Sequence, residues 1–171
     1  NGIDALAFSS GMAAITLMME LFKPGDHLIV DSDLYGGSIR LFRNVSRKNG
    51  ITFSTVDSYQ DDVESFVKEE TKAIYIETPT NPMMNVTDIG KLSEIAKRHN
   101  LLLIVDNTFL SPYFQNPLTL GADIVVHSGT KFLGGHNDTL AGFLVTNREE
   151  ISEQLRFLIK TTGAGLAPFD S

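Results

Sequence analysis

The stretch Leu101-Leu102-Leu103-Ile104-Val105-Asp106 places a carboxylic acid directly after five consecutive apolar residues. Such a run predicts a short strand that is buried on both faces, as in the middle of a parallel sheet. Asp106 would then lie at the carboxyl end of that strand, where the ligands of open α/β sheets bind. A charge there needs a cationic or hydrogen-bonding partner. Asp106 is therefore a candidate site residue, or alternatively a cap for the following turn.

Similar apolar runs recur on both sides of this strand. They predict further strands at His27–Val30, Ile51–Val56, Ala73–Ile76, Asp123–Val126 and Ala141–Thr146, beside the one at Leu101–Val105. Helical patterns lie between several of them, at Met12–Phe22, Ser38–Lys48, Asp61–Lys68, Asp88–His99 and Glu149–Lys160. The alternation predicts an α/β fold with a parallel, doubly wound sheet and flanking helices. No repeat or polar linker interrupts it, so we expect one domain over residues 1–171.

The composition restricts the classes of function. The chain of 171 residues carries a formal net charge of -7, which opposes binding to nucleic acid or to an anionic membrane. It has no cysteine, which excludes disulfides and thiolate metal sites and fits a cytoplasmic protein. No apolar run is long enough to cross a bilayer. Because the chain starts at Asn1 without methionine and ends at Ser171 without an evident cap, we expect a fragment of a longer protein.

Two further segments carry groups suited to chemistry. Lys131 follows Ser128-Gly129-Thr130 at a tight strand exit, where a lysine amine can be tuned for Schiff-base formation. Many lysines at strand ends are simply exposed, so this tetrapeptide alone leaves both interpretations open. Ser9-Ser10-Gly11 precedes an apolar helix whose first amides could bind a phosphate, although an ordinary N-cap explains these residues equally well.

Other kinds of site lack their signatures. The chain has no G-x-G-x-x-G after its first predicted strand, no P-loop and no G-x-S-x-G motif, so nucleotide binding and a serine hydrolase are disfavoured. His127, His136 and Asp138 could in principle hold a metal. Their spacing matches no structural pattern, and Lys131 would place a cation among them, so we predict no metal site.

Five ordered motifs carry a resemblance to a known family. They are Ser9-Ser10-Gly11-Met12-Ala13-Ala14, Asp33-Leu34-Tyr35-Gly36-Gly37, Glu77-Thr78-Pro79-Thr80-Asn81-Pro82, Val105-Asp106-Asn107-Thr108-Phe109 and His127-Ser128-Gly129-Thr130-Lys131. With them the sequence resembles, over essentially its whole length, the Cys/Met-metabolism or trans-sulfuration enzymes. Within that family it is most similar to bacterial cystathionine γ-synthase and cystathionine β-lyase.

The resemblance implies an aminotransferase-like (fold type I) large domain that binds pyridoxal 5′-phosphate. Lys131 would hold the cofactor as a Schiff base and shuttle protons, Asp106 would pair with the pyridine nitrogen, and Tyr35 would stack on the ring. The implied cofactor-binding residues are Ser10, Gly11, Met12, Tyr35, Asn81, Asp106, Thr108, Ser128, Thr130 and Lys131. By position alone, Tyr35 could instead be a packing aromatic and Asn81 a turn residue.

The resemblance also implies that both ends are truncated. The family's N-terminal arm and C-terminal domain have no counterpart here, and the full-length enzymes form homodimers or homotetramers. Gly37 stands where methionine γ-lyases typically have cysteine, and Gly129 stands where the family more often has alanine, which we expect to loosen the loop.

Four hypotheses for the function remain. The favoured reaction is a cystathionine γ-synthase-like γ-replacement on an activated homoserine, and the alternative is elimination from cystathionine by a β- or γ-lyase. A different class is a catalytically inactive domain that only binds cofactor or oligomerises, and a plain α/β binding module is the last possibility.

Overall fold

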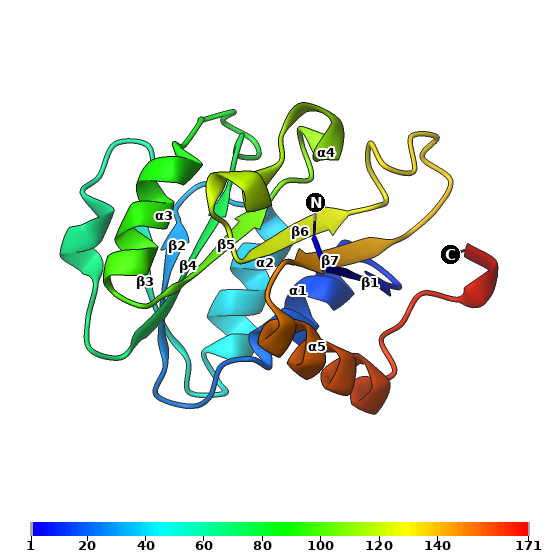
Figure 1. Cartoon of the computed structure of the whole chain (residues 1–171), viewed down its shortest axis with the longest axis horizontal. Helices are drawn as coiled ribbons and strands as arrows, with labels where there is room; N and C mark the ends of the chain where they lie inside the picture. The colour runs from blue at the N-terminus through cyan, green and yellow to red at the C-terminus, as the bar shows by residue number, and fades with distance from the viewer. Residues whose placement is uncertain (1, 171) are drawn as a thin grey trace.

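The computed structural model describes residues 2–170, which form a seven-stranded mixed sheet with helices on its faces (Figure 1). The strands are β1 (Asp4–Phe8), β2 (His27–Asp31), β3 (Thr52–Val56), β4 (Thr71–Glu77), β5 (Leu102–Asp106), β6 (Ile124–Ser128) and β7 (Gly142–Thr146). Their order across the sheet is β1-β7-β6-β5-β4-β2-β3. Strands β3, β2, β4, β5 and β6 run parallel, whereas β7 pairs antiparallel with both β6 and β1.

All six predicted strands are confirmed, with ends that differ by at most two residues. Strand β1 was not predicted. Its apolar content includes the two small residues Ala5 and Ala7, and its partner β7 lies more than a hundred residues away. The sheet is also not purely parallel. No helix is found between β6 and β7. The chain therefore turns back after β6 and forms β7 directly beside it, which makes this pair of strands antiparallel.

Four of the five predicted helices are confirmed. They are α1 (Gly11–Met19), α2 (Gly36–Leu41, continued by a π-helical turn at Phe42–Ser46), α3 (Ile89–Arg98) and α5 (Glu149–Thr162), and a further short helix α4 spans Ser111–Phe114. The helix predicted at Asp61–Lys68 was wrong, because that segment holds one 3-10 turn, Val63–Phe66. Only Val63 of that turn is buried, and Val67 is already extended, so no apolar stripe holds a longer helix against the sheet.

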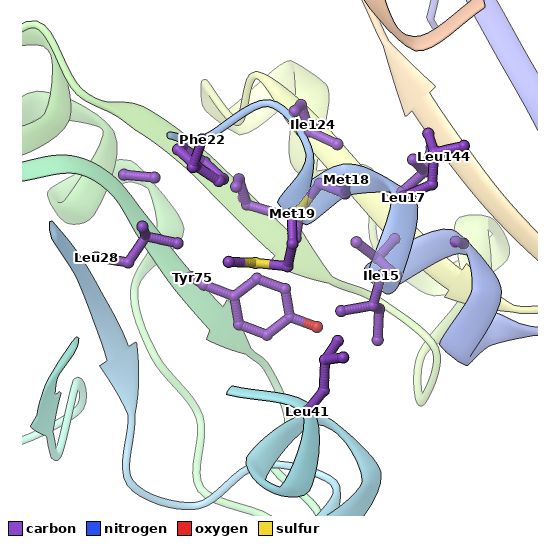
Figure 2. Close-up of a cluster of buried hydrophobic side chains, with 14 of the residues drawn as sticks. Ile15, Leu17, Met18, Met19, Phe22, Leu28, Leu41, Tyr75, Ile124 and Leu144 are labelled. Atoms are coloured by element: carbon purple, nitrogen blue, oxygen red, sulfur yellow. The ribbon is translucent and has the colours of Figure 1, made fainter. Parts of the chain in front are cut away.

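Two apolar cores flank the sheet. The larger core packs α1, α2 and α5 against one face, and Figure 2 shows Tyr75 of β4 lying among Ile15, Met19 and Leu41 of the helices on that side. The other core packs α3 against the opposite face, through residues such as Leu92 and Ile95. The strands thus have helices on both faces, as a doubly wound sheet requires (Figure 1). In the described residues, no helix combines the length and the hydropathy needed to cross a membrane.

Candidate active site

A cavity of about 510 Å³ is lined by all ten residues that were predicted from the sequence to bind the cofactor, together with eight others. It opens at the carboxyl ends of β4, β5 and β6, beside the start of α1. The fold therefore brings these ten residues together, although their convergence alone does not assign a role to any of them.

Asp106, the last residue of β5, is buried with 6% exposure. Its Oδ1 accepts hydrogen bonds from Thr108 N at 3.0 Å and Thr108 Oγ1 at 2.6 Å, and the Tyr75 hydroxyl lies 3.4 Å from Oδ2. Burial raises the pKa of Asp106, and the two hydrogen bonds from Thr108 partly oppose that rise. Among residues 2–170, no ion pair includes Asp106. The site therefore favours a ligand that brings its own positive charge to this carboxylate.

The start of α1 approaches the end of β6 very closely. A side chain at Gly11 would place its Cβ 2.9 Å from the Cβ of Ser128, so the approach requires glycine. Ser10 caps the helix by accepting a hydrogen bond from Ala13 N at 3.0 Å, which leaves its hydroxyl proton free to be donated. Ser10, Gly11, Met12 and Ser128 all line the cavity, so the start of a nine-residue helix and two hydroxyl residues lie together there, an arrangement that suits an anion.

Lys131 lies in a tight loop that follows β6. Lys131 N donates to Ser128 O at 3.3 Å, and Gly135 N donates to Lys131 O at 2.8 Å. The Thr130 hydroxyl lies 3.3 Å from Ala141 O and 3.2 Å from Ala141 N, so it both donates to and accepts from this residue. Thr130 therefore closes the loop, while the exposed side chain of Lys131 lines the cavity.

The structure explains why position 129 is occupied by glycine, which the sequence alone did not indicate. A Cβ at this position would lie 2.5 Å from Cε2 of Phe143 and 2.9 Å from the Cβ of Ala141. We expected this glycine to loosen the loop. The structure shows that its missing side chain also lets the loop pack closely on β7.

Tyr35 precedes α2 and is 43% exposed. Its ring lies so close to Gly37 that a Cβ on this glycine would overlap the ring, and the same Cβ would lie 2.8 Å from Sδ of Met12. Gly37 thus leaves the space that the Tyr35 ring occupies. This packing explains the place of the ring without assigning it a catalytic role.

Asn81 lies in the loop that follows β4 and is partly buried at the cavity wall. The loop is held by hydrogen bonds of its neighbours. Asn85 N donates to Thr80 Oγ1 at 2.9 Å, and Met83 N donates to Asp33 Oδ2 at 3.0 Å.

Glu77 is a lining residue to which the sequence analysis gave no role. It ends β4 in register with Asp106 on β5, and its Oε2 accepts a hydrogen bond from Tyr35 N at 2.7 Å. Burial, with a smaller effect of the nearby Asp106, raises the pKa of Glu77 to about 8. The signal in the sequence was an acid at the end of a buried strand, the same signal that marked Asp106.

The other lining residues that sequence reasoning missed are mostly apolar or small. They are Ile15, Phe109, Val126, Phe132, Gly135, Asn137 and Leu140. Five of them lie in loops, where no periodic pattern indicates which side chains face inward.

The histidine cluster considered for a metal does not converge. His127 points to the opposite face of the sheet, where it lines a second cavity of about 480 Å³. Burial lowers the pKa of His127 to about 4. His136 and Asp138 lie exposed in the loop after Lys131. Within residues 2–170, no three histidine or acidic side chains are grouped as metal ligands would be.

Comparison with known protein families gives a match over the whole chain. The profile described as "Cys/Met metabolism PLP-dependent enzyme" covers residues 1–171. The chain belongs to this family. Pyridoxal phosphate (PLP) is thus the cofactor of the family to which these residues belong.

Individual relatives agree with the family assignment. The chain is 56% identical over 172 residues to the cystathionine gamma-synthase/O-acetylhomoserine (thiol)-lyase of Bacillus subtilis, with 100% of this chain and 46% of the relative covered. It is 52% identical over 172 residues to a cystathionine beta-lyase of Lactococcus lactis subsp. cremoris, with 100% of this chain and 45% of the relative covered. The chain therefore spans less than half the length of these curated relatives.

The solved structure of cystathionine gamma-lyase from Lactobacillus plantarum complexed with L-serine superposes with a TM-score of 0.97 at 47% identity, over 99% of this chain and 45% of the other. This confirms the aminotransferase-like, fold type I architecture predicted from the sequence.

The residues of the cavity fit the family's cofactor. A pyridinium nitrogen needs a buried anion, which Asp106 can supply, since it is buried and forms no ion pair among residues 2–170. A phosphate needs hydrogen-bond donors, which the amides at the start of α1 can supply. An aldehyde needs an amine, and Lys131 lines the same cavity. Each of these groups comes from a different element, so the fit depends on the fold as a whole.

Proposed function

We propose that the full-length protein catalyses γ-replacement on an activated homoserine, with PLP as cofactor. The main support for the cofactor chemistry is the environment of Asp106. This carboxyl group is buried, forms no ion pair among residues 2–170, and lines the same cavity as Lys131 and the start of α1. The choice of reaction is supported by the Bacillus subtilis relative, which is named as a cystathionine γ-synthase and is 56% identical.

Each proposed role follows from the chemistry of the side chain. When bound, PLP withdraws electrons from the bonds at the α-carbon of an amino acid. Asp106 would hold the positive charge at the ring nitrogen. The Nζ of Lys131 would hold the cofactor and, as a free amine, would accept the α-proton and return it to a neighbouring carbon. Tyr35 would contact the ring and assist the incoming amine.

The phosphate would bind at the start of α1. The amides of Gly11 and Met12 and the hydroxyls of Ser10 and Ser128 are the donors proposed for it. The Thr130 hydroxyl already bonds Ala141, so it would have to redirect its proton to become a direct ligand.

Two more lining residues complete the proposed site. Asn81 would lie near the 3′ oxygen of the ring and the substrate carboxylate. Thr108 would act through the hydrogen bonds that hold Asp106.

The decisive experiment is chemical. The full-length protein is incubated with PLP and reduced with borohydride, and its peptides are mapped. We expect a stable adduct on Lys131 alone. If no adduct forms at saturating cofactor, or if the adduct maps to another lysine, the proposed cofactor chemistry is wrong.

Product analysis then separates the reactions. An O-acylated homoserine with cysteine should give cystathionine and the free acid. A β- or γ-lyase, the alternative supported by the relatives named as lyases at 52% identity, would instead convert cystathionine into a 2-oxo acid, ammonia and a thiol. Pyruvate would identify β-elimination and 2-oxobutyrate would identify γ-elimination.

Assembly and location are part of the same proposal. We infer a cytoplasmic homodimer or homotetramer that acts on small sulfur amino acids. Exposed apolar side chains at the cavity mouth support an assembly, because Phe132 and Leu140 are each 65% exposed. If the solution mass corresponds to an oligomer but no adduct forms, the result supports the alternative of a domain that oligomerises without catalysis.

A further inference from the structure

Two loops carry Tyr35 and Asn81 to the cavity wall. The first follows β2 and includes Asp33, and the second follows β4, whose last residue is Glu77. Glu77 Oε2 accepts a hydrogen bond from Tyr35 N at 2.7 Å. Asp33 Oδ2 accepts one from Met83 N at 3.0 Å. Each acid therefore holds the backbone of the loop to which it does not belong.

We propose that Glu77 and Asp33 are positioning residues that fix Tyr35 relative to Asn81 through this reciprocal pair of hydrogen bonds. The inference rests on the proposed function, in which Tyr35 and Asn81 both contact the cofactor. Neither acid needs to touch a substrate or the cofactor for this role.

The bond from Glu77 restrains Tyr35 at a point that the helix leaves free. The Tyr35 carbonyl already accepts from Ser38 N at 2.9 Å and Ile39 N at 3.2 Å, which begins α2. Its amide precedes the helix and so has no partner within it. With Glu77 bound to that amide, both sides of the Tyr35 backbone are fixed, and the ring has little freedom beyond its own rotamers.

Burial makes the Glu77 bond dependable. The side chain is 4% exposed at the end of β4, and the β4–β5 register places it beside Asp106. Its pKa is raised to about 8, so the carboxyl group is mostly protonated at neutral pH. The protonated form still has an oxygen that can accept the hydrogen bond from Tyr35 N. Glutamine has the same shape and also offers a carbonyl oxygen, so Glu77→Gln should preserve the bond and Glu77→Ala should remove it.

Amide hydrogen exchange of the cofactor-free, full-length protein tests the bonds directly. Glu77→Ala should speed the exchange of the Tyr35 amide about fivefold, and Asp33→Ala should do the same to the Met83 amide, because each loses one hydrogen bond. Glu77→Gln and Asp33→Asn should restore exchange to near the parent rate. Glu153→Ala is the control, since Glu153 is an exposed carboxyl on α5, far along the chain from both loops.

The PLP-loaded enzyme tests the consequence. Both alanine variants should alter the visible circular dichroism of the bound cofactor and raise KM for the amino acid severalfold, while the amide variants should restore both. Unchanged exchange in Asp33→Ala and Glu77→Ala would overturn the proposal. So would altered exchange with normal dichroism and KM, or a Glu77→Gln variant as impaired as Glu77→Ala. If Glu77→Ala does not fold, the Asp33 pair and Glu77→Gln still decide the outcome, and the Lys131 adduct reports separately on the proposed function.

Discussion

The two acids that line the cavity differ from the lysine in how much of their environment the fold supplies. Asp106 and Glu77 are 6% and 4% exposed, and burial is the main reason that the pKa of each is raised. Lys131 is exposed on a loop whose neighbouring apolar side chains are also uncovered. The fold thus fixes the orientation and protonation of the acids before any ligand binds. Among residues 2–170, no ion pair includes Lys131, so its charge must find a partner in what fills the cavity. Substitutions of the acids and of the lysine should therefore have different effects.

The largest effect is expected from Lys131→Ala. Loss of the amine removes both the covalent attachment and the proposed proton transfer, so turnover should fall by about 10³-fold or more. The free energy of unfolding of the cofactor-free protein should change by less than about 0.5 kcal/mol, because the side chain is exposed. Steady-state kinetics and urea unfolding measure the two quantities.

Lys48→Ala is the matched control, since Lys48 is exposed on a surface turn away from the lining residues. It should leave both turnover and stability at the parent level. A Lys131→Ala variant that keeps a tenth of parental turnover would contradict the role proposed for this amine.

Asp106→Asn should show the opposite pattern. Its amide NH₂ would face a ring nitrogen that carries a proton, and loss of a charged hydrogen bond should weaken PLP affinity about 10-fold to 100-fold. The cofactor-free protein should be equally stable or more stable, because the substitution removes a buried carboxyl that has no ion-pair partner among residues 2–170. Cofactor titration and urea unfolding of the same preparation test both statements. A strongly destabilised variant would show that Asp106 serves the fold rather than the ligand.

The pH dependence of stability sharpens the contrast through Glu77. The pKa of Glu77 is about 8 in the folded protein against an ordinary value of 4.5, so the folded state binds a proton that the unfolded state has released. Stability therefore falls as pH rises through this interval. His127, whose folded pKa is about 4, contributes in the opposite direction only up to its ordinary value of 6.5. Between pH 6.5 and 8 the Glu77 effect should amount to about 1–2 kcal/mol.

Glu77→Gln cannot titrate, so its free energy of unfolding should fall less than that of the parent over the same interval. Urea unfolding of both cofactor-free proteins at pH 6.5, 7.2 and 8 gives the comparison. Parallel pH profiles would mean that Glu77 is ionised in the folded protein throughout.

The sequence predicted the central strands because burial on both faces leaves a strong local signal. The run Leu101–Val105 is apolar throughout, and β5 forms there. Strand β1 has the burial pattern of an edge strand. It pairs with β7, which is distant in sequence, so no local sequence pattern could predict this strand. The predicted helix at Asp61–Lys68 failed for a related reason: its residues are compatible with a helix, but the sheet offers them no apolar surface to cover.

For the site, the sequence located the groups but not their connections. Asp106 was found from its place after an apolar strand, and the motifs added the residues now seen around one cavity. The hydrogen bond between Glu77 and Tyr35 joins residues 42 positions apart, so it becomes visible only when β4 and β2 pair. The close approach of Gly11 to Ser128 depends in the same way on the packing of α1 against β6.

The smallest expected effect concerns the start of α1. Ser10→Ala removes the cap that accepts from Ala13 N and should cost about 1 kcal/mol of stability. It should also weaken PLP binding, since the cap orders the amides proposed to hold the phosphate. Asp88→Ala removes an equivalent cap from α3, where Asp88 Oδ1 accepts from Lys91 N at 3.0 Å outside the cavity. Its stability loss should be similar, but its PLP affinity should stay at the parent value. If both variants weaken PLP binding equally, lower stability explains the loss, and the start of α1 has no special part in holding the phosphate.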